Sequence, residues 1–516
     1  MTDSAPPPAP AIELVGIDKS FGLVHANRDI NMAVAKGSIH GIVGENGAGK
    51  STLMSILYGF YQADAGEIRI DGAHVDIRTP DDAIDAGIGM VHQHFMLVDP
   101  FTVLENVMLG AEGGPMLRRG VAATRAELQR LEDDYSLEVD PDAIVGDLPV
   151  GLQQRVEILK ALYRGAQTLI LDEPTGVLTP PEADHLFRIL RQLRDQGKTI
   201  ILITHKLREI MAITDAVSVM RRGEIVATLP TADTTPEKLA ELMVGRHVLL
   251  RVKKGPAKPG RTLLEVENLI VGDQRGVMRV KNINFQVRAG EIVGIAGVAG
   301  NGQSELLETI AGIRRATAGR ILIDGKPIGA TGGANPSLLR KEGLAHVPED
   351  RHRMGLVMAF EENENAILGY HDDPLYLNGP FLNIDAIRAD ARQKIEQYDI
   401  RPPDCRLKTA NFSGGNQQKI VLAREMERDP DVLLVGQPTR GVDIGAIEFI
   451  HRQLVAMRDA GKAILLVSVE LDEVRSLADR ILVMFDGHIV GERAPDAGEG
   501  ELGLMMAGID NREAAQ

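Results

Sequence analysis

The stretch IHGIVGENGAGKSTLMSILYG, residues 39–59, decides the fold of this chain. Within it, GENGAGKS (Gly44–Ser51) has the spacing G-x-x-x-x-G-K-S/T of a phosphate-binding loop. The loop follows the apolar run IHGIV and opens the helical run STLMSILYG, the context that this motif requires. Its glycines let backbone N–H groups surround phosphate, while Lys50 supplies charge and the Ser51 hydroxyl suits Mg²⁺. The motif therefore predicts a nucleotide site.

The same stretch occurs a second time with changed residues. AGEIVGIAGVAGNGQSELLETIAG (Ala289–Gly312) aligns with KGSIHGIVGENGAGKSTLMSILYG (Lys36–Gly59) at a constant offset of 253 residues. Further along, LILDEPTG (Leu169–Gly176) aligns with LLVGQPTR (Leu433–Arg440) at an offset of 264 residues. A repeat of about 250 residues is far longer than a solenoid unit, so we interpret it as a duplicated domain.

Each half alternates short β-rich runs with helical runs, which predicts an α/β fold with a mainly parallel central sheet. An antiparallel β piece is expected at the front of each half, and residues 95–165 read as mostly helical. The basic run RVKKGPAKPGR (Arg251–Arg261) between the halves is interpreted as a solvated linker. We expect a disordered Pro-rich tail at 1–11, a first domain at 12–247, a linker at 248–262, a second domain at 263–507 and a tail at 508–516.

Composition narrows the possible functions. With 516 residues, the chain is too long for one hydrophobic core. A net charge of −16 argues against a nucleic-acid-coating surface, which needs clustered positive charge. The single cysteine, Cys405, excludes a disulfide framework or a cysteine-rich zinc site and fits a reducing cytosol. The start MTDSAPPPAPA lacks a secretory pattern, and no run of about 18 apolar residues occurs, so we expect a membrane role only through partners.

A second group of functional candidates follows the first loop. In TLILDEPT (Thr168–Thr175), an apolar strand ends in Asp172 and Glu173. A strand-end carboxylate can bind Mg²⁺, and a second one beside it can polarise an attacking water. Alone, such a pair is more often a turn, but a preceding phosphate loop favours the functional interpretation. His205 at the end of IILITH and Gln93 in GMVHQHFML are weaker candidates, because each is equally compatible with a surface role.

Together these motifs resemble the ATP-binding subunit of an ABC transporter, in two copies over about residues 12–495. The resemblance implies ATP and Mg²⁺ as cofactors, with Glu173 as catalytic base, His205 at the γ-phosphate, Gln93 as coupling glutamine and Lys50 in the catalytic set. It implies Ser51, Gln93 and Asp172 as metal ligands. FSGGN (Phe412–Asn416) matches the family signature LSGGQ. The implied nucleotide-binding residues are Phe21, Gly44, Glu45, Asn46, Gly47, Ala48, Gly49, Lys50, Ser51, Thr52, Ser413, Gly414 and Gly415.

Departures from the family pattern segregate between the halves. The first half loses its signature, which reads LPVGL with Pro149 in place of Ser413, and its loop after DEPT ends in Thr179 where the second half has Asp443. Proline has neither an N–H nor a hydroxyl to offer phosphate. The second half instead loses its catalytic set. The residues at the positions of the lysine, metal aspartate, base, histidine and coupling glutamine are Gln303, Gly436, Gln437, Val469 and Glu349.

Family members place each ATP between the phosphate loop of one half and the signature of the other. This arrangement implies one complete site, built from the first loop and the second signature. The opposite site, with the loop GVAGNGQSE (Gly297–Glu305), is degenerate. We expect this second loop to keep its shape and to hydrolyse ATP poorly, and we leave open whether it binds nucleotide.

Two such halves without a membrane segment resemble the carbohydrate-type importers of bacteria. The texture of VHQHFMLVDPFTVLENVMLG (Val91–Gly110) and LLVGQPTRGVD resembles the branch that imports nucleosides with a basic membrane lipoprotein. The resemblance implies two integral membrane permease subunits, an extracytoplasmic substrate-binding lipoprotein, no nucleic acid, and a peripheral place at the cytoplasmic face of the inner (plasma) membrane. Within His94–Thr102, Phe95, Met96, Leu97 and Phe101 form a candidate contact for a membrane subunit, with ordinary core packing as the alternative.

Other functions stay open from the residues. Ribose- and galactose-type importers share the tandem organisation but usually keep an acidic DEPT-like stretch in the second half, which is absent here. A less favoured alternative is a soluble tandem ATPase acting on ribosomes, although such relatives usually carry a long charged arm between two intact sites. A regulatory ATP-binding scaffold is the third alternative, and the intact catalytic set of the first half argues against it.

Overall fold

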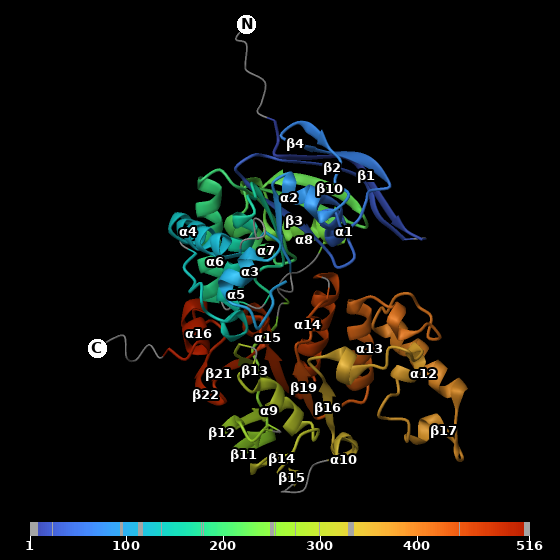
Figure 1. Ribbon diagram of the computed structural model, residues 1–516. Coiled ribbons are helices and arrows are strands. Elements are labelled where there is room, and N and C mark those ends of the chain that lie inside the picture. Colours follow the sequence, from blue (N-terminus) through green and yellow to red (C-terminus); the bar gives the residue numbers. More distant parts are fainter. Residues whose placement is uncertain are drawn as a thin grey trace. The chain divides into compact units, whose positions relative to one another are not determined.

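The computed structural model describes residues 9–22, 24–92, 96–111, 117–135, 137–176, 178, 180–247, 252, 254–273, 275–298, 300–328, 335–442 and 444–509. Most of both predicted tails lies outside these ranges, as do Gln93, Thr179 and Asp443. The chain divides into two compact units, Met1–Val248 and Leu249–Gln516 (Figure 1). Each unit is described by itself.

The core of the first unit is a six-stranded sheet in the order β10-β9-β3-β8-β7-β6. The pairs β6–β7, β7–β8, β8–β3 and β3–β9 are all parallel. The edge strand β10 pairs antiparallel with β9. The central strands are apolar and buried, which fits a sheet covered on both faces and confirms the buried strands expected from the sequence. The strands are β3 (Ile39–Gly44), β6 (Ile88–Val91), β7 (Thr168–Asp172), β8 (Thr199–Ile203), β9 (Ala216–Arg221) and β10 (Glu224–Pro230).

An antiparallel sheet packs over this core, in the order β2-β1-β4-β5. Its inward side chains, such as Ile12 and Ile30, share a cluster with Leu53 and Met54 of α1 (Lys50–Leu57) and with Ile170 of β7. This helix is therefore held by residues from both sheets, which fixes the loop that precedes it. The strands are β1 (Ile12–Phe21), β2 (Val24–Val34), β4 (Ala65–Ile70) and β5 (Ala73–Val75).

Helices dominate the rest of the unit. The stretch predicted to be helical contains α3 (Val103–Met108), α4 (Leu117–Tyr135) and α5 (Val150–Tyr163). In Figure 1 these helices lie at the opposite end of the unit from β1, β2 and β4. The other helical segments are α2 (Pro80–Asp85), η1 (Val145–Asp147), α6 (Pro180–Asp195), α7 (Leu207–Ile213), η2 (Thr231–Asp233) and α8 (Pro236–Val244).

The second unit repeats this topology. Its main sheet has the order β16-β19-β20-β13-β21-β22, and its antiparallel sheet has the order β12-β11-β14-β15. The two-domain α/β fold class predicted from the sequence is confirmed. The strands are β11 (Thr262–Gly272), β12 (Met278–Arg288), β13 (Glu291–Ala296), β14 (Ala318–Ile323), β15 (Lys326–Ile328), β16 (Leu344–Val347), β17 (Leu377–Asn378), β18 (Phe381–Leu382), β19 (Val432–Gly436), β20 (Ala463–Ser468), β21 (Arg480–Phe485) and β22 (His488–Arg493).

Helices of the second unit occupy the equivalent places in the chain. One short hairpin, β17–β18, precedes α12. The helical segments are α9 (Gln303–Ile310), α10 (Pro336–Lys341), η3 (Arg351–Gly355), α11 (Glu362–Asn365), η4 (Pro374–Tyr376), α12 (Ile384–Gln397), η5 (Thr409–Asn411), α13 (Gly414–Met426), α14 (Ile444–Asp459), α15 (Leu471–Leu477) and α16 (Glu499–Met506).

The interpretation of the basic run as solvated does not hold for Lys254. Its Nζ donates to the carbonyl oxygens of Leu477 and Ala478 and lies 3.2 Å from the Asp479 carboxylate. The buried Arg458 donates to the carbonyl of Gly255 at 3.1 Å. This part of the predicted linker therefore packs against the second unit.

Candidate nucleotide site

The loop of the first unit has a backbone that only glycine tolerates at two places. Gly47 and Gly49 have φ values of 81° and 98°, in the left-handed region. A Cβ added at Gly49 would lie 2.3 Å from the carbonyl oxygen of Ala26. Among the described residues, no side chain caps the start of α1 directly after this turn. The strand, the turn and the helix thus leave the first N–H groups of α1 as partners for an anion.

Lys50 is buried against the inside of this loop. The residue is only 6% exposed, and its Nζ donates to the carbonyl oxygens of Gly44 at 2.8 Å and Glu45 at 3.1 Å. Burial lowers the pKa of Lys50, while the charges of Glu173 and Asp172 oppose that change. The ammonium group is therefore held at the end of β3, within the field of both strand-end carboxylates.

The two carboxylates at the end of β7 have opposite pKa shifts. Burial, and then the neighbouring Glu173, raise the pKa of Asp172 to about 6, against the attraction of Lys50. Burial also raises the pKa of Glu173, but the hydrogen bond with His205 and the charges of His205 and nearby lysines outweigh it, so the net shift is downward. The Nδ1 of His205 lies 2.7 Å from a Glu173 oxygen. Environments that shift the pKa values of two neighbouring carboxylates in opposite directions are typical of sites where the two groups have different roles, as acid, base or metal ligand.

Glu173 is also held by its backbone. It has a φ of 49°, which is uncommon for a residue other than glycine. Its N–H donates to the carbonyl of Ile203 at 2.9 Å, so the end of β7 is tied to the end of β8. His205 lies two residues after the end of β8, and the pairing of the two strand ends explains why residues 32 positions apart meet. The structure therefore brings together Lys50, Asp172, Glu173 and His205.

Phe21, which the family resemblance implies as a nucleotide-binding residue, ends β1 and is 43% exposed. Its ring makes an edge contact with Tyr61, with centroids 5.1 Å apart, and Lys19 lies 5.6 Å from the ring centre. Tyr61 was not among the residues predicted from the sequence. Its only signal is its place just after the helix that follows the phosphate loop.

The second loop keeps the same backbone. Gly300 and Gly302 have φ values of 90° and 100°, and a Cβ at Gly302 would lie 2.1 Å from the Arg279 carbonyl oxygen. Gln303 is 5% exposed, and its Nε2 donates to the carbonyl of Val298 at 3.1 Å. Val298 is the counterpart of Glu45, so Gln303 repeats one contact of Lys50 without the charge.

The strand ends of the second unit lack the hydrolytic set. Gln437, the counterpart of Glu173, keeps a φ of 47°, but its Oε1 accepts from the backbone N–H of Val469 at 3.3 Å. Glu349 accepts a hydrogen bond from the Ser304 hydroxyl. Burial raises the pKa of Glu349, against the effect of that hydrogen bond. The Ser304–Glu349 contact could not be read from the sequence, since it joins residues 45 positions apart.

The two signature stretches differ as the sequence indicates. Ser413 caps α13, and its hydroxyl accepts from the side chain of Asn416 at 2.8 Å. Pro149 occupies the equivalent place before α5, and no side-chain cap is present there within the described residues. Arg351, which the sequence did not single out, donates to the carbonyl of Arg440 at 2.7 Å and lies against Gly414. Its only signal is its place beside the coupling position in VPEDR.

Comparison with known proteins identifies the family. The sequence model of the ABC transporter family matches residues 27–176 and 280–440, which include both loops and both strand ends. The chain belongs to the ABC transporter family. The family, the fold class and the class of enzyme, an ABC-type ATPase, therefore agree with the predictions made from the sequence.

Curated members of the ABC family resemble the chain over nearly its full length. The guanosine import ATP-binding protein NupO of Bacillus subtilis is 49% identical, and the alignment covers 98% of this chain and 99% of NupO. The nucleoside import ATP-binding protein NupA of Lactococcus lactis is 46% identical, with 96% of this chain and 98% of NupA covered. The ribose import ATP-binding protein RbsA of Chromobacterium violaceum is 40% identical, with 93% of this chain and 94% of RbsA covered.

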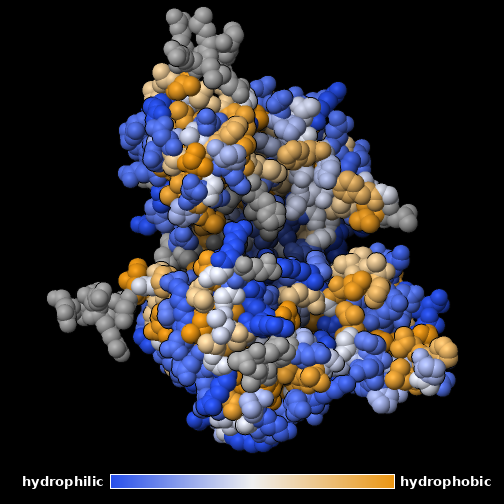
Figure 2. Space-filling view, turned by 60° about the horizontal axis from the view of Figure 1, so that its bottom comes forward, coloured by the Kyte–Doolittle hydropathy of each residue, from blue (hydrophilic) through white to orange (hydrophobic). Residues whose placement is uncertain are grey.

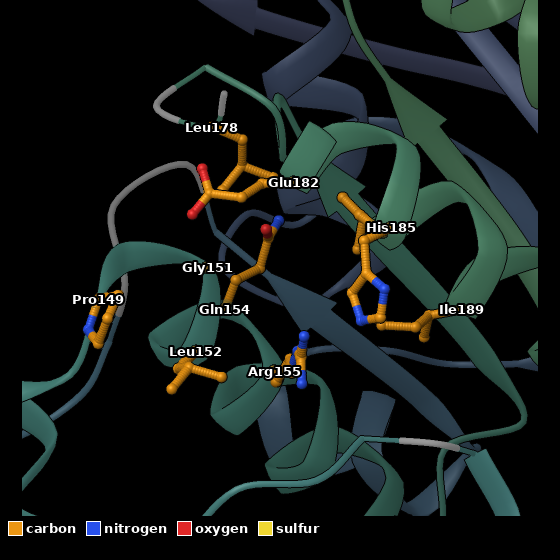
Figure 3. Close-up of a pocket in the computed structure, with 10 residues that line it drawn as sticks. Pro149, Gly151, Leu152, Gln154, Arg155, Leu178, Glu182, His185 and Ile189 are labelled. Atoms are coloured by element: carbon orange, nitrogen blue, oxygen red, sulfur yellow. The ribbon is translucent and has the colours of Figure 1, made fainter. Parts of the chain in front are cut away.

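A cavity of about 230 Å³ lies beside the altered signature of the first ABC unit (Figure 3). It is formed by the start of α5 and by α6, with Pro149, Arg155, Glu182 and His185 in its lining. These residues belong to neither the phosphate loop nor the strand ends, so the cavity is separate from the nucleotide site. Among the described residues, no group of three or more His, Cys, Asp or Glu could hold a metal ion.

The helices and the exposed apolar residues concern the predicted contact with a membrane subunit. No helix in the described ranges is long and apolar enough to cross a bilayer. The face in Figure 2 is largely hydrophilic, with apolar residues in small groups. Of the candidate contact residues in the first unit, Met96 is 58% exposed and Phe101 is 38% exposed, whereas Phe95 lies outside the described ranges.

Proposed function

We propose that this chain is the ATP-hydrolysing subunit of an ABC importer that carries nucleosides. The observation that carries the proposal is the Lys50, Asp172, Glu173 and His205 arrangement around one loop of the first unit. The second unit has a loop of the same shape without these groups. The guanosine and nucleoside import relatives, at 49% and 46% identity, favour nucleosides over the ribose cargo of a relative at 40%.

Hydrolysis in this proposal occurs at one composite site. Lys50 and the N–H groups of the first loop bind the phosphates, and Ser413, Gly414 and Gly415 of the second unit cover them from the other side. The support for this pairing is complementary loss, since the unit with the intact loop has Pro149 in its signature. Gln93 and Asp443 also belong to the proposed site, although both lie outside the described residues.

Within that site, Glu173 polarises the attacking water. Its lowered pKa keeps the carboxylate ionised at neutral pH, and His205 holds the carboxylate in place. Mg²⁺ would be held by Ser51, Asp172 and Gln93, and it supplies positive charge to the phosphate oxygens. Asp172 is partly buried and has a raised pKa, and among the described residues Lys50 is the positive charge that offsets it, so this carboxylate fits a cation.

The partners follow from the same proposal. The chain works with two integral membrane permeases and an extracytoplasmic lipoprotein, at the cytoplasmic face of the inner (plasma) membrane, without binding nucleic acid. The exposed Met96 and Phe101 support a permease contact, because apolar side chains in water favour a partner surface. Leu97 and Phe95 are proposed to extend this contact.

The test is uptake of labelled nucleosides and labelled ribose by cells whose only copy carries Glu173→Gln. We expect nucleoside uptake to fail and ribose uptake to persist. A matched Gln437→Ala strain should keep nucleoside uptake. Unchanged nucleoside uptake in the Glu173→Gln strain would contradict the proposal that nucleosides are the cargo. If ribose uptake were lost instead, the cargo would be a sugar.

A further inference from the structure

The cavity between α5 and α6 of the first unit lies where the second unit has an aromatic side chain. His185 of α6 lines this cavity, and its counterpart at an offset of 264 residues is Phe449 of α14. In the second unit, the Nζ of Lys419 lies 5.0 Å from the centre of the Phe449 ring, and the Tyr398 ring makes an edge contact with centroids 5.7 Å apart. The first unit has the smaller imidazole at this place, beside a space of about 230 Å³.

One side of the cavity carries hydrogen-bond donors that lack acceptors. Arg188 donates to Nδ1 of His185 at 3.0 Å, so Nδ1 is the acceptor of the ring and Nε2 carries the proton. Burial, and then the charges of Arg155 and Arg188, lower the pKa of His185, which keeps the ring neutral. Its Nε2 is buried and has no hydrogen-bond partner among the described residues. Arg155 makes one hydrogen bond within the same ranges, from Nη1 to the carbonyl oxygen of Glu138 at 3.2 Å, so most of its N–H groups remain for a ligand.

The other side of the cavity carries an acceptor. The Glu182 carboxylate lies against the start of α5, since a Cβ added to Gly151 would lie 3.2 Å from its Oε1. Figure 3 shows this carboxylate at the opposite end of the cavity from Arg155. The walls between the two ends are mainly apolar and fit the faces of a flat ring. They include Leu152, Leu178, Leu186 and Ile189.

The pattern of donors and acceptors indicates the class of ligand. A ligand that fits needs acceptors on one edge, a donor on another edge and apolar faces. A purine with an oxygen at position 6, such as guanine, has this pattern, because O6 and N7 accept and N1–H donates. Arginine pairs with O6 and N7 of guanine in the same way in DNA recognition. Adenine does not fit, because its N6 amino group places a donor beside N7.

We propose that the cavity between α5 and α6 binds a 6-oxopurine, either as the free base or as its nucleoside. Arg155 and the Nε2–H of His185 donate to O6 and N7, and the Glu182 carboxylate accepts from N1–H. The second unit has Lys419, Phe449 and Ala446 at these three positions, so it lacks the site. The inference rests on the proposed function, because the ligand would be cargo of the importer bound to the subunit that drives its own import.

The test is equilibrium dialysis of the full chain against radiolabelled guanosine, guanine or adenosine. We expect one site per chain that binds guanosine or guanine roughly 10-fold or more tightly than adenosine, because one bidentate arginine contact discriminates between bases by about that factor. Binding of guanine without guanosine would identify the free base as the ligand. A saturating non-hydrolysable ATP analogue should not displace the ligand, since the nucleotide site is separate.

Variants that copy the second unit connect this binding to the cavity. Arg155→Lys combined with His185→Phe introduces a packing that the second unit already contains, and we expect guanosine binding to fall roughly 10-fold or more while ATP hydrolysis persists. Glu182→Ala should weaken guanosine binding as well. Phe449→His in the second unit is the matched control and should leave binding unchanged.

Three results would overturn the inference. They are a parent chain that binds neither guanosine nor guanine, equal binding of adenosine, and unchanged guanosine binding in the double variant. Retained ATP hydrolysis shows that the double variant is folded. Dialysis measures binding without transport, so a failure of the cargo proposal in the uptake experiment would be distinguishable from a failure here.

Discussion

Glu173 in the first unit has a φ of 49°, and its Oε1 lies 2.7 Å from Nδ1 of His205. Its counterpart in the second unit, Gln437, has a φ of 47°, and its Oε1 lies 3.3 Å from the backbone nitrogen of Val469. The last glycines of the two loops have equally similar backbones, with φ values of 98° for Gly49 and 100° for Gly302. The backbone of a phosphate loop is thus retained in both units, whereas its charged side chains are retained in one. The comparison shows that the shape of the site and its hydrolytic chemistry depend on separate residues.

The change that tests this comparison most severely is Glu173→Gln. It removes the base and leaves the left-handed backbone in place, so we expect ATP hydrolysis by the purified chain to fall roughly 10²–10⁴-fold. The matched change, Gln437→Ala, removes an amide side chain that accepts a hydrogen bond from the backbone N–H of Val469, and we expect it to leave most of the activity. Phosphate release measures both. Comparable losses from the two variants would show that both units hydrolyse ATP.

The next largest effect is expected from the lysine of the first phosphate loop. Lys50→Ala removes a charge-assisted contact worth roughly 1.5–3 kcal/mol, so ATP affinity at the first site should fall about 10–150-fold. Gln303→Ala in the second unit should change affinity far less, and Gln303→Lys should raise it, since its amide already reaches the Val298 carbonyl. Equilibrium binding of a fluorescent ATP analogue, with hydrolysis blocked by Glu173→Gln, measures these changes. An equal loss from Lys50→Ala and Gln303→Ala would contradict the asymmetry.

A smaller effect is expected from His205→Val, which copies Val469 into the first unit. The hydrogen bond from His205 lowers the pKa of Glu173 against the effect of burial, so its loss lets that pKa rise. Because the base acts ionised, the acid limb of the pH profile of kcat should move to higher pH. His205→Gln, which can keep a donor, should move the limb less. A uniform loss of rate at every pH would instead mean that His205 acts only on phosphate.

Much of this arrangement could be predicted from the sequence because it depends on local pattern. The apolar runs of β3, β7 and β8 are buried on both faces, and such strands appear as continuous apolar stretches. Lys50 and the glycines belong to one short motif whose spacing encodes its geometry. Asp172 and Glu173 follow a strand in the same way. In these cases, the residues that act together are also close in sequence or lie at strand ends.

The unpredicted features depend on which side chains meet in space. The contact between Ser304 and Glu349 joins a helix start to a neighbouring strand end, and Lys254 finds its carbonyl partners more than 220 positions away. Periodicity reports whether a residue is buried and not what it touches. Glu362 is a further case, because a glutamate in the acidic run EENEN reads as a surface residue yet is 1% exposed.

Glu362 leads to the smallest expected effect, on stability alone. Aligning FTVLENV with FEENENA at an offset of 259 places Glu362 opposite Val103, which is fully buried in the first unit. Among the described residues, neither carboxylate oxygen of Glu362 has a hydrogen-bond partner, and burial raises its pKa to about 8 against the attraction of Lys394. The folded chain therefore holds a proton that the unfolded chain releases above about pH 4.3.

Stability should consequently fall as pH rises from about 4.3 to 8, and Glu362→Val should remove that loss. One pKa unit is worth about 1.36 kcal/mol, and after relaxation around the buried charge we expect a gain of roughly 1–2 kcal/mol at pH 8.5 and little change at pH 5. The gain corresponds to a rise in Tm of about 2–8 °C for a unit of this size. Thermal unfolding at both pH values measures it, with Val103→Glu as the reciprocal control that should destabilise the first unit at high pH. Equal shifts in Tm at pH 5 and pH 8.5 would show that the stability difference between glutamate and valine at this position comes from packing and not from the ionisation of Glu362.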